Sequence, residues 1–280
     1  MPATCTWEQA VEWLRGQSDR QDLVAQCYYD DPVEAAARRF HAASEWQATR
    51  ELLHGHLPGA VLDVGAGRGI ASYAFAVDGS RVTALEPDGS DLVGRGCIEA
   101  LARRTGLPIR CAAGYGEGLP FAAGQFDVVY GRAVLHHARD LRGLMREVAR
   151  VLRSGGMALF TREHVISRPG DLPAFLAGHA LHGLYGGEHA YLLRDYTSAC
   201  VAAGLRMRRV LGPWETAANY WPCTDEDVDR FVRRKLERRV GGRLASRCLR
   251  SATVRRTLRA WFSRTSREPG RLFSFLAVKP

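Results

Sequence analysis

The sequence predicts an α/β protein with a doubly wound, mostly parallel seven-stranded sheet, a helical N-terminal cap and inserted helices before the last strand. Three observations lead to this prediction. Short apolar segments alternate with amphipathic ones between residues 60 and 211. A glycine-rich turn follows the first of these segments. The 280 residues are 46% hydrophobic and 25% charged, which is typical of a globular chain with a substantial core.

The order of the segments suggests four parts. Residues 1–55 form the helical cap, residues 56–211 the core with its ligand site, residues 212–269 an inserted aromatic loop with basic helices, and residues 270–280 the last strand of the core sheet.

Helix-start signals predict the cap. Thr6 and Gln9 have the spacing of a capping box, and so have Ser44 and Gln47, whose helix should run to about residue 53. Pro32 is expected at the first helical position of a helix between these two, because its missing N–H costs nothing there.

The core should alternate strands and helices. Strands are expected at residues 60–64, 82–85, 108–112, 126–130, 157–160, 205–211 and 272–278, and helices at residues 69–77, 91–104, 141–152 and 196–203. Residues 167–190 and 214–221 interrupt this rhythm and are expected to shape a substrate pocket, as loops at strand ends do.

The net charge of +9 comes from one late segment. Residues 225–271 hold 15 Lys/Arg and 6 Asp/Glu, and the rest of the chain is neutral. Two basic helices are expected there, one from Thr224 and one after residue 242. They are either a solvated face or a surface for an anionic membrane, with residues 228–262 as the membrane contact.

The spacing of the cysteines bears on metal binding, and the hydropathy of the chain bears on its cellular location. The seven cysteines form no CxxC pair, so we expect reduced thiols and no metal site, zinc included. No stretch reaches the roughly 20 apolar residues of a membrane span, and Glu8 and Glu12 occupy the N-terminus where a signal peptide would be basic. The expected location is cytoplasmic, with peripheral membrane contact left open.

The segment that carries chemistry is residues 61–69, VLDVGAGRG. A buried strand runs into glycines 65, 67 and 69 and then into a helix whose free N–H groups can meet a ligand. The next strand ends at Glu86, 17 residues beyond Gly69. A carboxylate at that place can accept hydrogen bonds from two ribose hydroxyls. The pattern therefore predicts a nucleoside site.

Two nucleoside cofactors compete for this site. A dinucleotide fold normally shows GxGxxG, whereas this chain shows GxGxG preceded by Asp63. An acid there would repel a pyrophosphate but can hold an ammonium- or sulfonium-bearing amino acid, directly or through water. This favours S-adenosylmethionine (SAM) over NAD.

The ordered motifs resemble those of class I SAM-dependent methyltransferases of the small-molecule type 11 (UbiE-like) group. Residues 61–69 resemble the family's first motif and Glu86 its ribose acid, while residues 114–121 resemble its adenine loop. Residues 126–137 resemble its fourth strand with the following helix, and residues 151–156 its turn before the fifth strand.

The resemblance implies a Rossmann-like methyltransferase fold, SAM as cofactor and an antiparallel last strand. Tyr115 departs from the family, which usually has Asp there; tyrosine can stack on the adenine or donate its hydroxyl. The cofactor-binding candidates are Asp63, Gly65, Ala66, Gly67, Gly69, Glu86, Pro87, Tyr115, Gly116, Glu117 and Arg132.

Candidate bases follow the fourth and fifth strands. They are His136, His137 and His164, with Glu163 beside the last and with His182 and His189 further on. The alternative is that these histidines only pack or cap a helix. Arg132 is expected to orient the SAM carboxylate or a substrate acid.

The expected function is SAM-dependent methyl transfer to an O, N or C atom of a small molecule or a glycan or lipid precursor. The alternatives are an NAD-dependent oxidoreductase and a SAM-binding protein without catalysis. Residues 130–133 read YGRA, which lacks the Asn/Asp-Pro-Pro-aromatic box of DNA amino-methyltransferases, so specific DNA binding is not expected. RNA as a partner stays open.

Overall fold

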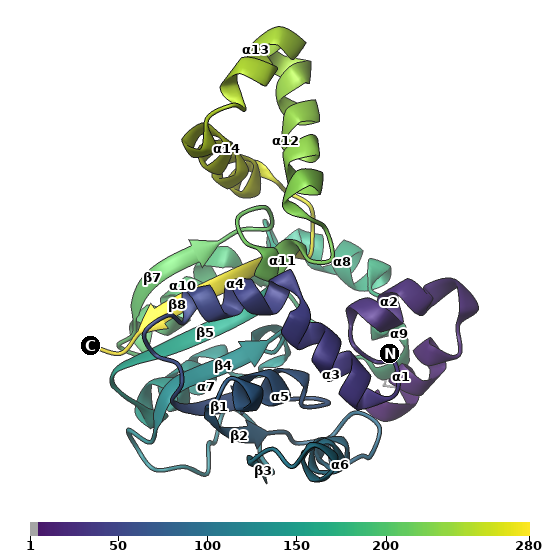
Figure 1. Ribbon diagram of the computed structural model, residues 1–280, viewed down its shortest axis with the longest axis vertical. Helices are drawn as coiled ribbons and strands as arrows, with labels where there is room; N and C mark the ends of the chain where they lie inside the picture. Colours follow the sequence, from purple (N-terminus) through teal and green to yellow (C-terminus); the bar gives the residue numbers. More distant parts are fainter. Residues whose placement is uncertain (1–4) are drawn as a thin grey trace.

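One mixed sheet organises the computed structural model, which describes residues 5–280 (Figure 1). Residues 1–4 of the expected cap lie outside the described residues. The sheet has the order β3-β2-β1-β4-β5-β8-β7, and a short β6 pairs with β5 beside this path. The strands are β1 (Ala60–Val64), β2 (Arg81–Leu85), β3 (Ile109–Ala112), β4 (Phe126–Arg132), β5 (Leu152–Ile166), β6 (Tyr191–Leu192), β7 (Arg206–Leu211) and β8 (Arg271–Val278).

The strand pairing confirms the predicted fold class. β1 pairs in parallel with β2 and β4, and β5 pairs in parallel with β4. β8 runs antiparallel between β5 and β7, as the resemblance implied. From β1 the chain adds β2 and β3 on one side of β1, and it then returns to add β4 on the other side. The strand order therefore reverses between β1 and β4. Ligands of open α/β sheets bind at the carboxyl ends of strands at such a reversal.

Helices cover both faces of the sheet. Side chains of α3, α4, α5 and α6 form one buried layer with β1, β2 and β4, and those of α7 and α10 form the other. The helices before β5 are α1 (Trp7–Arg15), η1 (Ser18–Arg20), α2 (Gln21–Gln26), α3 (Val33–Ala42), α4 (Ser44–Leu52), α5 (Ile70–Val77), α6 (Arg95–Thr105), η2 (Leu135–His137) and α7 (Leu141–Val151). The helices after β5 are η3 (Pro169–Asp171), α8 (Leu172–Gly178), α9 (His182–Tyr185), α10 (Leu193–Ala202), α11 (Ala217–Tyr220), α12 (Asp225–Val240), α13 (Gly242–Cys248) and α14 (Ala252–Thr265).

The helix-start signals of the cap were partly right. The capping box of Thr6 and Gln9 is present at α1. Pro32 is the N-cap residue of α3 rather than its first helical residue, because its backbone is extended. Ser44 is the first residue of α4, and the extended Ala43 is the N-cap without a side-chain hydrogen bond, so the second capping box is wrong.

The segment expected as a pocket loop contains short helices. Residues 167–190 include η3, α8 and α9, and β5 extends to Ile166, well beyond the expected residue 160. The longer strand carries Glu163 and His164 toward this segment.

The basic segment forms three helices that project from the body of the molecule (Figure 1). Two helices were expected, but the second one breaks at Ser251, whose side chain accepts a hydrogen bond from the Val254 amide and starts α14. Between residues 5 and 280, every helix is too short or too polar to cross a bilayer.

Candidate functional site

The glycine-rich turn after β1 needs left-handed backbone. Gly65, Gly67 and Gly69 have φ angles of +63°, +54° and +78°. A side chain at Gly65 would also place its Cβ 2.5 Å from Val134, so the turn packs directly on the segment that follows β4. Ala66 donates its amide to the Leu85 carbonyl, which fixes the turn to the end of β2. Gly69 starts α5 without a side-chain cap, so the first amides of α5 can donate to a ligand.

Asp63 lies buried at the end of β1 beneath this turn. Its Oδ2 accepts a hydrogen bond of 2.6 Å from the Ser72 hydroxyl of α5. Burial raises the pKa of Asp63 to about 7, although the Ser72 hydrogen bond lowers it in part. A cation placed near Asp63 would favour the ionised carboxylate.

Glu86 follows β2 and faces the turn. Its two oxygens accept the amides of Gly67 at 2.8 Å and Asp88 at 2.9 Å. Arg95 donates to the carbonyls of Glu86 and Pro87, 2.8 Å each, and so fixes this strand end. Burial raises the pKa of Glu86 against the effect of the two amides. A carboxylate can accept about four hydrogen bonds, so the Glu86 carboxylate can accept hydrogen bonds from two further donors.

The loop after β3 carries the expected adenine contacts. Tyr115 is 70% exposed, and Gly116 allows the chain to pass Leu144, which a Cβ would approach to 2.8 Å. Glu117 accepts the Arg139 amide at 2.9 Å and the Asp140 amide at 3.4 Å. The loop is thus tied to the start of α7.

Arg132 ends β4 and is paired with a buried acid of the cap. Its guanidinium donates to both oxygens of Glu45, at 2.7 and 3.3 Å. Tyr28 donates to the same carboxylate at 3.2 Å, and Nε of Arg162 lies 3.9 Å from it. Two guanidinium groups therefore share one carboxylate, which leaves one positive charge in this buried place.

Arg68, within the turn, also reaches the cap. Its guanidinium donates to the carbonyls of Tyr28 and Asp30, at 2.9 and 2.7 Å, and pairs with the Asp31 carboxylate. The side chain is almost completely buried. The N-terminal helices are therefore anchored on the same turn that carries the expected cofactor contacts.

His136 and Glu163 form a buried pair. Nδ1 of His136 lies 2.7 Å from Oε2 of Glu163. The carboxylate also accepts the amides of Val134, Leu135 and His136, at 3.0 to 3.1 Å. Three of the four acceptor sites of the Glu163 carboxylate are used by these amides, and the fourth accepts the Nδ1 hydrogen of His136. The lone pair of His136 is therefore on Nε2. Burial lowers the pKa of His136 well below its ordinary value and raises that of Glu163 to about 7.

Further histidines surround Glu188, whose side chain is 4% exposed. Nε2 atoms of His136, His179 and His137 lie 3.6, 3.7 and 4.0 Å from Oε2 of Glu188. His164 stacks edge-on against His136 with ring centroids 4.6 Å apart, and burial lowers its pKa to about 3.

The predicted residues thus lie in two adjoining groups. Asp63, Glu86 and the glycines form one, and His136, His137 and His164 form the other. Val134 links the two, because it packs beside Gly65 and its carbonyl accepts the His137 amide. His182 and His189 each keep a buried Nδ1 without a hydrogen-bond partner. The sequence did not indicate Glu188, His179, Glu45 or Arg68. The contacts of Glu188 with His136, of Glu45 with Arg132 and of Arg68 with Tyr28 join segments that are distant in the chain.

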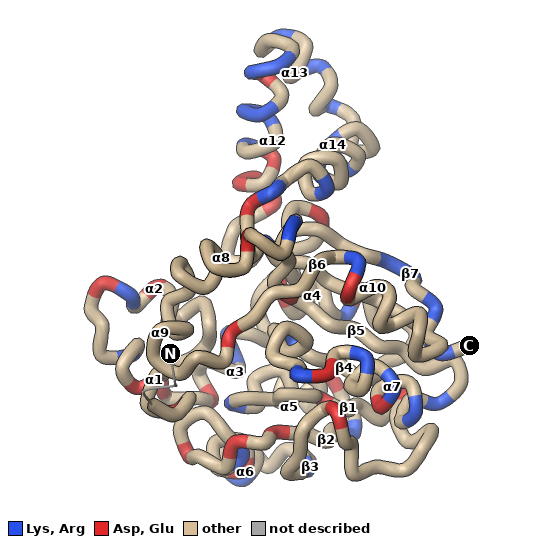
Figure 2. Tube along the Cα trace, turned by 180° about the vertical axis from the view of Figure 1, so that it is seen from behind, with Lys and Arg blue, Asp and Glu red and all other residues tan. Residues whose placement is uncertain are grey.

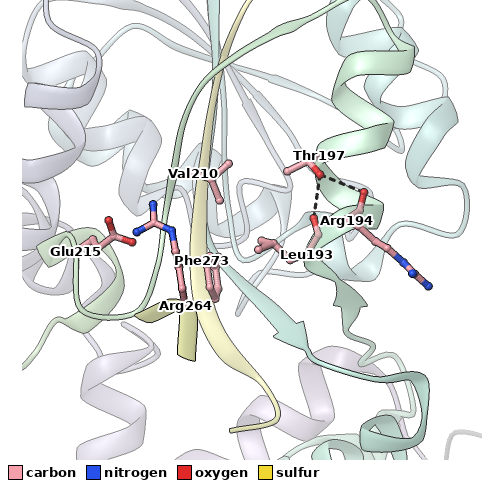
Figure 3. Close-up of a pocket in the computed structure, with 7 residues that line it drawn as sticks. All are labelled: Leu193, Arg194, Thr197, Val210, Glu215, Arg264 and Phe273. Atoms are coloured by element: carbon pink, nitrogen blue, oxygen red, sulfur yellow. Dashed lines mark hydrogen bonds between the residues drawn. The ribbon is translucent and has the colours of Figure 1, made fainter. Parts of the chain in front are cut away.

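A separate cavity of about 450 Å³ lies between α10, β7, β8 and α14 (Figure 3). It is lined by Leu193, Arg194, Thr197, Val210, Glu215, Arg264 and Phe273. None of the predicted site residues lines this cavity, so it is not the predicted cofactor site.

The chain is similar to known methyltransferases. Residues 62–160 match the model of a methyltransferase domain. A ubiquinone biosynthesis O-methyltransferase from Rhizobium johnstonii is 29% identical over 175 residues, which covers 60% of this chain and 69% of that protein. An uncharacterized methyltransferase from Mycobacterium sp. strain JLS is 35% identical over 119 residues, covering 42% of this chain and 44% of the relative.

Solved structures share the fold. The geranyl diphosphate C-methyltransferase from Streptomyces coelicolor A3(2), in complex with Mg²⁺, geranyl diphosphate and S-adenosyl-L-homocysteine (SAH), is similar with a TM-score of 0.57. The match has 16% sequence identity and covers 90% of this chain and 85% of that one.

Proposed function

Because the chain is a class I SAM-dependent methyltransferase of the type 11 (UbiE-like) group, we propose that it methylates a hydroxyl oxygen of a small molecule. Its cofactor is SAM. The choice of oxygen rests on the imidazoles beside the carboxyl ends of β4 and β5, and it agrees with the name of the O-methyltransferase relative.

The cofactor would lie over the glycine-rich turn. In this proposal Glu86 accepts the ribose hydroxyls, Asp63 faces the ammonium group of SAM, and the exposed Tyr115 covers the adenine. The excess positive charge at Arg132 and Arg162 would take the carboxylate of SAM.

His137 is the proposed base. Its Nδ1 lies 3.0 Å from the Gly187 carbonyl, which can only accept, so Nδ1 carries the hydrogen and Nε2 the lone pair. The side chain is 37% exposed, so a substrate can reach it. Nε2 would take the hydroxyl proton while the oxygen attacks the SAM methyl carbon and the carbon–sulfur bond breaks, releasing SAH. Glu188, 4.0 Å away, would then stabilise the imidazolium.

The strength of such a base limits the acceptor. An imidazole has a pKa of about 6.5 in water and a phenol about 10, whereas aliphatic alcohols are far less acidic. General base catalysis is efficient only when the proton transfer is not strongly uphill. We therefore propose a phenolic or similarly acidic hydroxyl.

The test is transfer of an isotope-labelled methyl group from SAM to a series of phenols, aliphatic alcohols and amines. We expect label on phenolic oxygen, and a fall in kcat of about 10²–10⁴-fold in His137→Gln with SAH affinity retained. The exposed His54 supplies the control variant, His54→Gln, which should keep wild-type kcat. Label on nitrogen or carbon only, or full activity of His137→Gln, would contradict the proposal.

We also propose that α12–α14 contact an anionic membrane, which would suit a lipid-precursor substrate. Lys and Arg positions occur all along the chain of this projection (Figure 2). Val240 and Leu244 are 41% and 51% exposed at its far end, beside the exposed Arg238, Arg243 and Arg247. Apolar side chains flanked by arginines suit insertion at a lipid headgroup layer.

Vesicle sedimentation tests this surface. Wild-type protein should bind phosphatidylglycerol vesicles and dissociate from them as the salt concentration rises. It should not bind vesicles of pure phosphatidylcholine. Leu244→Asp should bind more weakly, and Val201→Asp, at an exposed apolar position of α10, should bind as wild type. Retention on RNA without any vesicle binding would contradict the membrane assignment.

A further inference from the structure

His136 and His164, which lie beside Glu188, have no part in the proposed cofactor contacts and are not the proposed base. We infer that His136, His164 and Glu188 form a binding site for a divalent transition-metal ion. One ligand atom from each residue lies within 4.8 Å of the other two. The three residues come from different parts of the fold: η2 after β4, the end of β5, and the segment after α9.

Both imidazoles are prepared as ligands by hydrogen bonds on their other nitrogen. Nδ1 of His136 donates to Glu163 at 2.7 Å, and Nδ1 of His164 donates to the Gly270 carbonyl at 2.9 Å. Each ring therefore keeps the lone pair on Nε2. Histidines that bind metals almost always donate their second nitrogen to a carboxylate or a backbone carbonyl in this way.

The carboxylate of Glu188 has a hydrogen-bond partner on only one of its two oxygens. Its Oε1 accepts the Tyr185 hydroxyl, but its buried Oε2 has no hydrogen-bond partner. Nε2 of His136 is 3.6 Å from Oε2 and Nε2 of His179 is 3.7 Å from it, too far for hydrogen bonds. An unpaired buried carboxylate oxygen among imidazole lone pairs is costly unless a cation lies between them.

The spacing suits an ion at the centre. Two ligand atoms bonded at about 2.1 Å to one tetrahedral ion lie about 3.4 Å apart. The 3.6 Å between Nε2 of His136 and Oε2 of Glu188 is close to this value. The three ligand atoms all lie within 4.8 Å of one another, so small side-chain movements would bring each of them to bonding distance of one ion.

The donor set selects the kind of metal. Imidazole nitrogens with one carboxylate suit Zn²⁺, Fe²⁺ or Co²⁺, whereas Mg²⁺ and Ca²⁺ prefer oxygen ligands throughout. Three protein ligands leave positions open for a water or a substrate oxygen. A substrate hydroxyl bound there would lose its proton to His137 more readily; this consequence rests on the proposed function, whereas the metal site does not.

Cobalt binding tests the site directly. Untagged protein, stripped with a chelator and dialysed, is titrated with Co²⁺ while visible absorption and bound metal are measured. We expect one Co²⁺ per chain with micromolar or tighter affinity, displaced by Zn²⁺ but not by a comparable concentration of Mg²⁺. Glu188→Gln and His164→Ala should each lose at least 100-fold in affinity, and Glu163→Gln about 10- to 100-fold.

His54→Ala, at an exposed histidine, is the matched control and should bind Co²⁺ as wild type. SAH titration and thermal unfolding of each variant show whether it is folded. Absence of stoichiometric Co²⁺ from the wild type would overturn the metal site, as would unchanged binding in folded Glu188→Gln and His164→Ala. Neither result depends on methyl transfer, so failure of the metal site and failure of the proposed O-methylation are distinguishable.

Discussion

Two buried carboxylates beside the glycine-rich turn serve different purposes at the residue scale. Glu86 holds two backbone amides and keeps capacity for two more donors. Asp63 has a single hydroxyl partner, Ser72, and its raised pKa reflects this poor solvation. A ribose with two hydroxyls suits Glu86, and a cationic amino group suits Asp63.

Glu86→Ala should weaken SAH binding. Hydrogen bonds to a charged group contribute roughly 1.5–3 kcal/mol each, so the loss should be at least about 10-fold in Kd. Glu86→Gln, which keeps one acceptor, should lose less. Calorimetric titration with SAH measures both, and unchanged affinity in a folded Glu86→Ala would remove the ribose assignment.

The titration of Asp63 should appear in the pH dependence of stability. The folded pKa of about 7 lies above the unfolded value near 3.8, so the folded state binds this proton more tightly. The contribution of Asp63 to the free energy of unfolding therefore falls as pH rises from about 4 to 7, by about 1.4 kcal/mol per pH unit at most.

Asp63→Asn removes this slope while keeping an acceptor for Ser72. Urea unfolding of both proteins at pH 5, 6, 7 and 8 gives the difference in stability at each pH. We expect the wild type to lose stability relative to Asp63→Asn as the pH rises. A difference independent of pH would show that Asp63 titrates normally.

At the element scale, the turn between β1 and α5 links two structures. The turn was predictable because strand, glycines and helix are consecutive, and Glu86 follows at a spacing that the βαβ geometry fixes. The contact of Arg68 with the cap was not, because its partners lie 37 to 40 residues earlier and nothing in the local pattern relates them.

Arg68→Ala should loosen the cap. The substitution removes two charged hydrogen bonds to buried carbonyls, so we expect a loss of about 3 kcal/mol in the free energy of unfolding. The pair with the partly exposed Asp31 should add little. Urea unfolding measures the loss, with the exposed Arg104→Ala of α6 as the control expected within about 0.5 kcal/mol of wild type.

The histidine cluster shows the same limit of sequence reasoning. His136 and His137 follow β4, and His164 lies near the end of β5, so their position near the carboxyl ends of these strands could be predicted from strand order. Glu188 and His179 come from residues 167–190, which the sequence predicted to shape a substrate pocket without indicating either residue. The contact of His137 with Gly187 spans 50 residues, and only folding brings them together.

On the scale of the whole molecule, the sheet with its two helical layers is distinct from the projecting α12–α14. Val228, Val232 and Leu236 of α12 pack with Ala245, Leu249 and Phe262 in one hydrophobic cluster, and Trp214 and Tyr220, which precede α12, pack against it. Arg259 of α14 binds Asp225 and Asp229 of α12, which closes the projection on itself.

Replacing residues 225–265 with a short flexible linker should therefore leave the cofactor site in place. We expect SAH affinity within about 3-fold of wild type, because none of the proposed cofactor contacts lies in the projection. Calorimetry and circular dichroism measure binding and folding. A shortened protein that folds and does not bind SAH would mean that the cofactor site includes these helices.

Calorimetric titration of the full chain with SAH, with NADH titrated in parallel, tests the central claim most directly. The account predicts one SAH bound per chain with micromolar affinity and no heat from NADH. Binding of NADH alone would contradict the placement of SAM over the GxGxG turn beside Asp63, and binding of neither ligand would contradict a working cofactor site at Glu86.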